Sequence, residues 1–285
     1  MAKGNLFLGT AARSVGDVVM YRREGSQVSR VRVRKIANPK TDAQCEQRAF
    51  MSAVVKYYQP LANVLDRSWQ GLSRAKSYAK FLKTNVGIVR SKGLYFTKDA
   101  GWKPLPLQLS NGTLPSIGVA ATSDSSYIMI DMSGEGAQAP TTVKQASDLF
   151  IAQGYKNGDV ITIIAPYTED GVNWIPYSGQ FIINTGDAGT PLANTMGNIE
   201  FVKDITSDYL AVQVNGSDLV GLGCIISRSI DGVWNRTKSF MALSNQEKSK
   251  YNTPEAKAAA IASYKGAAAS DNPLVYLDGD ELDNA

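Results

Sequence analysis

Alternating apolar and polar positions near the start of the chain predict a β-hairpin over residues 17–36. An apolar run at 18–21 leads into a turn at 24–26, and valines at 28, 31 and 33 lead out of it. The turn contains a glycine, which favours a tight connection between antiparallel strands. We therefore expect two paired strands at this end of the chain.

A row of arginines is expected on one face of the second strand, because side chains alternate between the two faces of a strand. Val31 and Val33 then lie on one face, and Arg30, Arg32 and Arg34 lie on the other. Their guanidinium groups would stand about 6.5–7 Å apart, close to the phosphate spacing along a nucleic-acid strand. The pattern therefore favours contact with a nucleic-acid backbone.

Further basic residues flank this row. They are Arg22, Arg23, Lys35 and Lys40. Arginine binds phosphate through two parallel N–H donors, so we predict that the hairpin contacts phosphate. An alternative stays open, because basic residues on an edge strand also prevent edge-to-edge aggregation.

Helical periodicity replaces the strand pattern after residue 40. Thr41 and Gln44 have the spacing of a capping box, and the following pattern predicts a helix to about residue 58. Two more helices are predicted over 61–69 and 73–85. We expect their apolar and aromatic residues to form a core rather than to stack on bases.

Three lysines recur in the last of these helices at i, i+4 and i+7. They are Lys76, Lys80 and Lys83, and this spacing places them on one helix face. We predict that they extend the positive surface of the hairpin and contact the same anionic partner.

Beyond residue 106 the chain consists of short apolar runs separated by Gly, Asn, Asp, Ser and Thr. Strands are predicted at 127–132, 159–165, 179–184, 199–203, 209–214, 223–228 and 233–242. Many short strands at this spacing are typical of a β-sandwich or barrel. A short helix is expected at 147–153, between the first two strands.

The end of the chain differs again. Thr253 and Pro254 mark a helix start, and the alanine-rich stretch 256–269 favours a helix. Residues 277–285 form an acidic tail, which we expect to be solvated.

Together these elements predict an α+β fold. It would consist of an N-terminal β-hairpin plus helices, a mainly antiparallel β-sandwich or barrel, and a C-terminal helix. We expect a basic domain at 1–104, a β-rich domain at 105–245, and a helix with an acidic tail at 246–285. The first two should be separate units joined near residues 100–110.

Charge divides along the same boundary. Residues 1–104 contain 20 Lys and Arg against 6 Asp and Glu, a balance of +14, and the remainder has a balance of −10. Such a division creates an extended positive potential that attracts polyanions. The excess could instead be a solvated face that keeps the domain soluble.

Candidate catalytic groups are sparse. The chain has no histidine, which excludes His-based triads and disfavours most zinc sites. No phosphate-binding glycine loop is complete. We therefore expect a non-enzymatic protein without metal or cofactor.

The two cysteines, Cys45 and Cys224, are expected to be buried thiols in a reducing compartment rather than a disulfide. No apolar run is long enough to span a bilayer, and the first residues lack the pattern of a signal peptide. We expect no contact with a membrane.

Several N-terminal segments resemble a known protein family. They are residues 1–9, residues 14–19, the Arg/Val strand and the stretch Asn38 to Arg48, and the likeness is clearest over 1–60. The family is a largely uncharacterised group of gut phages and their bacterial hosts, and its phage members are often labelled DNA-binding proteins. The resemblance implies no catalytic residue.

Two functions are consistent with these patterns. The first is a phage-associated protein that binds nucleic acid without sequence preference, in the host cytoplasm or packaged in the virion. The second is a capsid or tail assembly protein that docks its basic part on acidic phage structural proteins, with the β-rich part able to form homo-oligomer contacts.

Overall fold

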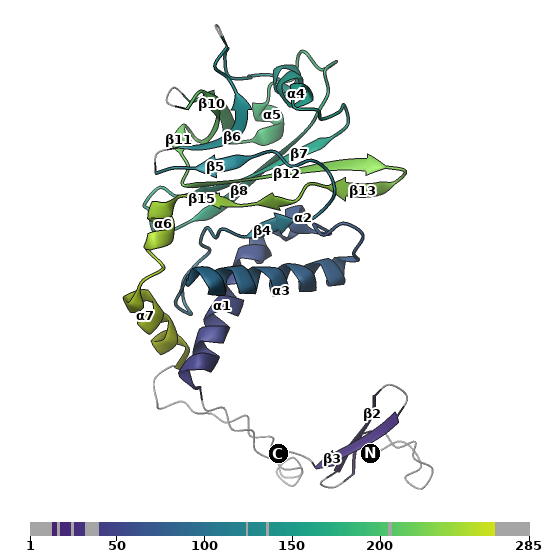
Figure 1. The fold of residues 1–285 in the computed structure, drawn as a ribbon, viewed down its shortest axis with the longest axis vertical. Coiled ribbons are helices and arrows are strands. Elements are labelled where there is room, and N and C mark those ends of the chain that lie inside the picture. Colours follow the sequence, from purple (N-terminus) through teal and green to yellow (C-terminus); the bar gives the residue numbers. More distant parts are fainter. Residues whose placement is uncertain are drawn as a thin grey trace, which may run out of the picture. The chain divides into compact units, whose positions relative to one another are not determined.

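The computed structural model describes residues 13–15, 18–23, 26–31, 40–123, 125–134, 137–204 and 207–265. The chain divides into two compact units. One consists of Met1–Lys40 and Gly266–Ala285, and the other is Thr41–Lys265. Each unit is described by itself, and Figure 1 labels the elements.

The first unit contains a three-stranded antiparallel sheet in the order β1 (Arg13–Val15), β2 (Val18–Arg23) and β3 (Ser26–Val31). Arg23 pairs with Ser26, so a two-residue connection joins β2 to β3. This pairing agrees with the predicted hairpin, whereas β1 was not expected. The predicted continuation of the second strand beyond Val31 lies outside the described residues.

The second unit begins with helices. They are α1 (Asp42–Tyr58), the 3-10 turn η2 (Gln59–Leu61), α2 (Ala62–Leu65) and α3 (Arg74–Lys92). The predicted cap of α1 is confirmed, because Thr41 Oγ1 accepts a hydrogen bond from Gln44 N at 3.4 Å. The second predicted helix is reduced to η2 and α2, and α3 runs well past the predicted end at residue 85.

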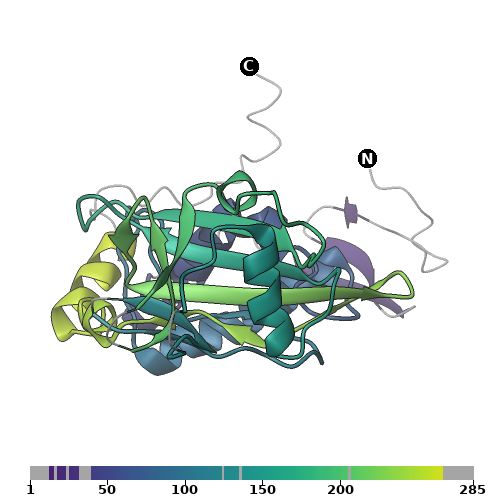
Figure 2. The same cartoon turned by 90° about the horizontal axis from the view of Figure 1, so that it is seen from above.

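Antiparallel strands follow in several sheets. One sheet has the order β11 (Ser217–Asp218), β10 (Tyr209–Val214), β6 (Ser126–Asp131) and β5 (Val119–Ala121), with β9 (Ile199–Lys203) also paired to β10. A second has the order β13 (Val233–Arg236), β12 (Gly221–Ile230), β7 (Val160–Tyr167) and β8 (Ile175–Ile182), with β15 (Ala242–Leu243) also paired to β12. The hairpin of β12 and β13 extends outward from its sheet (Figure 2).

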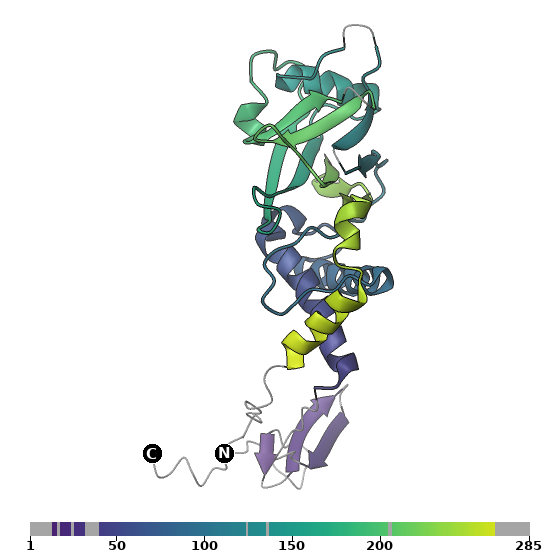
Figure 3. The ribbon, with the colours of Figure 1, turned by 90° about the vertical axis from the view of Figure 1, so that its left-hand side faces the viewer.

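The second sheet lies between the first sheet and the helices (Figure 3). Its strand β7 is buried along almost its whole length, as expected for a strand covered on both faces. Ile161 and Ile163 belong to the core shared with the first sheet, and the neighbouring Ile164 belongs to the core shared with the helices. The unit is therefore built in three layers.

The two cores draw on different parts of the chain. The core between the sheets is completed by α4 (Val143–Ala152) and α5 (Ala193–Met196), and it includes Phe150 and Phe181. In the other core, Phe50 and Phe81 of the helices pack with Ile225 of β12. Residues before and after position 104 thus share one core. The predicted domain boundaries remain predictions for proteolysis to test.

The remaining elements connect these layers. A two-stranded sheet pairs β4 (Gln108–Ser110) with β14 (Ser239–Phe240). The short α6 (Asn245–Ser249) precedes α7 (Pro254–Lys265), which packs along α1 through ion pairs of Lys257 with Glu46 and of Lys265 with Asp42. The predicted cap of α7 is confirmed, because Thr253 Oγ1 accepts from Ala256 N at 3.1 Å.

The α+β class is confirmed, and the strands are antiparallel as predicted. Within the described ranges the sheets do not close into a barrel, because β8 and β13 are free edges of the second sheet. The strand expected over 233–242 is broken into β13, β14 and β15. At the break, Thr237 Oγ1 accepts from Ile226 N and Thr237 O accepts from Ser110 Oγ, which redirects the chain from β12 to β4.

Candidate nucleic-acid interface

The basic face of α3 is the part of the predicted interface whose side chains the structure describes. The helix has six Lys and Arg residues and no Asp or Glu. Its buried residues, Ser77, Phe81, Asn85 and Val89, form one stripe that faces the core. Since an α-helix turns about 100° per residue, Lys76, Lys80 and Lys83 lie on the opposite side.

All three lysines are exposed. None of them makes a hydrogen bond or an ion pair with another residue in the described part of the chain. This distinguishes them from Lys144, Lys257 and Lys265, each of which pairs with a carboxylate. Their ammonium groups are therefore available to an external anion.

Arg90 continues this face toward the end of α3. It is exposed, and its Nη2 donates to the side-chain oxygen of Gln47 in α1. Lys76 and Arg90 are 14 residues apart, so the basic face extends for about 21 Å along the helix. Sequence reasoning missed Arg90 because it ended the helix at residue 85, although its spacing of seven from Lys83 continues the pattern.

Small residues separate the charges on this face. Ala79 and Gly87 are exposed there, and a Cβ added at Gly87 would meet nothing within 4 Å. Glycine in the middle of a helix is destabilising by about 0.5–1 kcal/mol relative to alanine. The space around Gly87 would accommodate an alanine, and without a side chain there the helix backbone is open to close approach by a partner.

Asn85 fixes the orientation of the helix. Its Nδ2 donates to Gln108 O at 2.9 Å, and its Oδ1 accepts from Gln108 N at 2.8 Å. Both residues are buried. This pairing ties the centre of α3 to β4 and holds the opposite, lysine-bearing side toward solvent.

The hairpin residues of the predicted interface belong to the other unit. Arg22 and Arg23 lie in β2 opposite Gln27 and Ser26, and Arg30 lies in β3 opposite Val19. Arg32, Arg34 and Lys35 lie outside the described residues. Lys40 is half-buried, with φ of 46°. The arginine row therefore stays a prediction.

Among the described residues no group of three or more Cys, Asp or Glu side chains could hold a metal ion. Cys45 and Cys224 are buried thiols that form no disulfide with each other, as predicted, and burial raises the pKa of the Cys224 thiol to about 12. No helix in the described part of the chain is long and apolar enough to cross a membrane.

Residues 9–87 match a family model described as a family of unknown function (DUF6266). The matched segment contains the three-stranded sheet, α1, α2 and α3 up to Gly87. Every residue of the predicted interface falls within it. Comparisons with curated proteins and with solved structures found no significant match.

Proposed function

We propose that this protein is a phage-associated, non-enzymatic protein that binds nucleic acid without reading its sequence and can be packaged in the virion. The observation that carries the proposal is the exposed, unpaired set of Lys76, Lys80 and Lys83 on a helix without acidic residues. Lysines in such a setting contact phosphates, and phosphate contacts supply sequence-independent affinity.

The charge distribution supports the same function. The +14 charge balance of residues 1–104 attracts a polyanion over a long range. On α3 itself no Asp or Glu neutralises the lysines. The hairpin arginines Arg22, Arg23, Arg30, Arg32 and Arg34, with Lys35 and Lys40, are proposed as additional phosphate contacts. The phage association rests on the N-terminal resemblance.

The test is the salt dependence of binding to random-sequence duplex DNA, measured by fluorescence anisotropy. Phosphate contacts predict that log affinity falls linearly with log salt concentration. The triple variant Lys76→Gln, Lys80→Gln and Lys83→Gln should flatten the slope by about 2–3 units. A matched variant that changes the exposed Lys98, Lys156 and Lys238 to Gln loses the same charge elsewhere and should change the slope by less than about 1 unit. Absence of binding at low salt would refute the function.

A second candidate is a capsid or tail assembly protein that docks on acidic phage structural proteins. The tip of the β12–β13 hairpin favours it, because Ile230, Val233 and Trp234 are 46%, 56% and 49% exposed. Clustered exposed apolar residues are typical of protein–protein contacts. Quantitative mass spectrometry of purified phage particles tests this role. An assembly protein should be present at a fixed copy number per particle, and the Trp234→Ser variant should no longer be incorporated into particles.

A further inference from the structure

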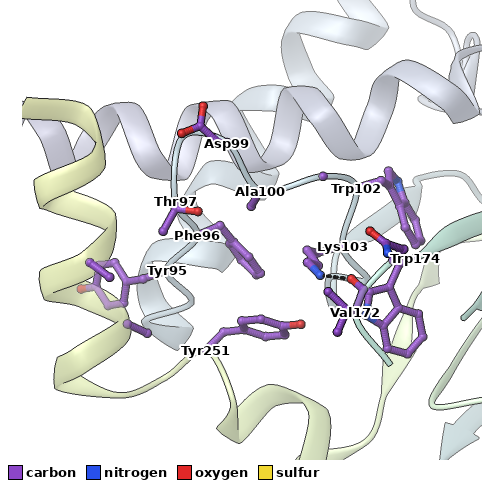
Figure 4. A pocket seen from close by; sticks show the side chains of 14 residues that line it. Tyr95, Phe96, Thr97, Asp99, Ala100, Trp102, Lys103, Val172, Trp174 and Tyr251 are labelled. Atoms are coloured by element: carbon purple, nitrogen blue, oxygen red, sulfur yellow. Dashed lines mark hydrogen bonds between the residues drawn. The ribbon is translucent and has the colours of Figure 1, made fainter. Parts of the chain in front are cut away.

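A pocket of about 510 Å³ opens between the segment after α3, the β7–β8 turn and α7 (Figure 4). Small-molecule sites usually occupy about 300–1,000 Å³. The walls come from residues 95–97, 99–103 and 172–174 and from Tyr251, Ala256 and Ala259, all within the second unit. The pocket shares no residue with the basic face of α3.

Trp102 forms a fixed aromatic wall of this pocket. Its ring stacks on Tyr57, with centroids 5.3 Å apart and planes inclined by 27°. Its Nε1 donates to Tyr57 O at 3.2 Å. The stacked face and the polar edge are therefore occupied within the protein, and the indole can offer its remaining surface to a ligand without reorienting.

Tyr251 and Trp174 are two further aromatic residues that line the pocket. Tyr251 Oη donates to Glu247 Oε1 at 2.9 Å, and its ring lies 4.6 Å from that of Phe96. Trp174 is 7% exposed, and its ring lines the pocket while its Nε1 is covered by the protein. Burial raises the pKa of the Tyr251 phenol, and the nearby Trp174 side chain lowers it.

The rim adds polar groups of both kinds. Thr97, Asp99 and Asn173 are exposed and line the opening. Lys103 Nζ reaches into the pocket and donates to Val172 O. The site can thus both donate hydrogen bonds to a ligand and accept them from it.

Lys103 has charged neighbours of both signs. Burial lowers the pKa of its ammonium group, Glu247 and Asp170 raise it, and Lys250 lowers it further. Asp99 adds a negative charge at the rim. The charged side chains that line the pocket are therefore one lysine and one aspartate, with no excess of either sign.

We propose that this pocket binds a short, uncharged saccharide. Sugar rings present C–H faces that pack on aromatic rings, and their hydroxyl groups both donate and accept hydrogen bonds. Trp102 would stack on a sugar ring, and Thr97, Asp99 and Asn173 would form hydrogen bonds with its outer hydroxyl groups. The site is independent of the proposed nucleic-acid function.

Other ligand classes fit these groups less well. The lining has no excess positive charge that would bind the phosphate of a nucleotide. A purely apolar ligand would cover the polar groups of Thr97, Asp99 and Asn173 without forming hydrogen bonds with them.

The experiment is a screen of the full chain on an array of neutral oligosaccharides, with isothermal titration of the best ligand and of maltotriose, cellotriose and triacetylchitotriose. We expect one site per chain and a change in tryptophan fluorescence. Trp102→Ala should weaken binding about tenfold or more, the range for loss of one aromatic stacking contact. Trp234→Ala, which removes an exposed tryptophan far from these walls in sequence, should leave the affinity within about twofold.

A second variant guards against misfolding of Trp102→Ala. Ala259 is exposed on α7 and lines the pocket, so Ala259→Trp fills the space without removing a wall. It should abolish saccharide binding and leave the melting temperature unchanged. The proposal is overturned if no oligosaccharide binds at millimolar concentration, if Ala259→Trp binds normally, or if thymidine monophosphate or duplex DNA displaces the sugar. The Lys76, Lys80 and Lys83 variant should bind saccharide normally, which separates this site from the nucleic-acid function.

Discussion

Asn85 of α3 and Gln108 of β4 are joined by a reciprocal pair of hydrogen bonds that are both buried. The side chain of Asn85 pairs with both the N–H and the C=O of Gln108, as the backbone of a neighbouring strand would. Replacing Asn85 with Ala leaves a buried N–H and a buried C=O without partners. We expect the free energy of unfolding to fall by about 2–4 kcal/mol, measured by urea denaturation.

Asn63→Ala is the matched control, because Asn63 is exposed on α2. It should change stability by no more than about 0.5 kcal/mol. Equal effects of the two substitutions would show that the Asn85 pair contributes nothing beyond helix propensity.

Two glycines of the same helix should respond in opposite directions to alanine. Gly87 lies in mid-helix with open space around it, so Gly87→Ala should stabilise the protein by about 0.5–1 kcal/mol. Gly93 ends α3 with φ of 61°, and an added Cβ would lie 3.0 Å from Asn252 Oδ1. Gly93→Ala should therefore be destabilising by about 1 kcal/mol. Thermal and urea denaturation of both variants measure the two signs.

The arginine row can be tested independently of α3. Changing Arg30, Arg32 and Arg34 to Gln should flatten the salt slope for duplex DNA by about 2–3 units, while the protein stays folded. Changing the same residues to Lys keeps the charge and should preserve the slope. If the Gln variant unfolds, these arginines belong to a structural ion-pair network. If it folds and binds DNA unchanged, their role is to prevent aggregation through an exposed strand edge.

Cys224 makes stability depend on pH in the alkaline range. Burial raises the thiol pKa to about 12 in the folded protein, from about 8.5 in an unfolded chain. Because the folded value is the higher one, its stabilising contribution is complete below about pH 8.5 and is lost as the pH rises toward 12. Cys224→Ala should remove this part of the alkaline decline in stability.

Local rules predicted the parts of the fold that depend on neighbouring residues. The caps at Thr41 and Thr253 and the bounds of β9 and β10 follow from short-range patterns and are confirmed. The end of α3 was wrong by more than a turn. Asn85 and Gly87 disfavour a helix in isolation, but Asn85 finds its partner in Gln108, 23 residues later, and this tertiary contact overrides propensity.

The candidate sites divide in the same way. The lysine face of α3 was predictable because periodicity alone places Lys76, Lys80 and Lys83 together. The pocket was not, since Trp102, Trp174 and Tyr251 come from three distant segments and their types are equally suited to a core. Only the folded chain brings these three aromatic residues to one pocket.

The alternation of Ile163 and Ile164 between two cores has a consequence for solubility. A fragment that begins after residue 104 would lose α1 and α3 and would turn the Ile164 side of the central sheet into surface. Ile225 and Met241 would be uncovered with it. A contiguous apolar patch on an antiparallel sheet promotes self-association. The helices α1 and α3 therefore protect the central sheet from aggregation. A fragment that contains the β-rich part should include these helices to stay soluble.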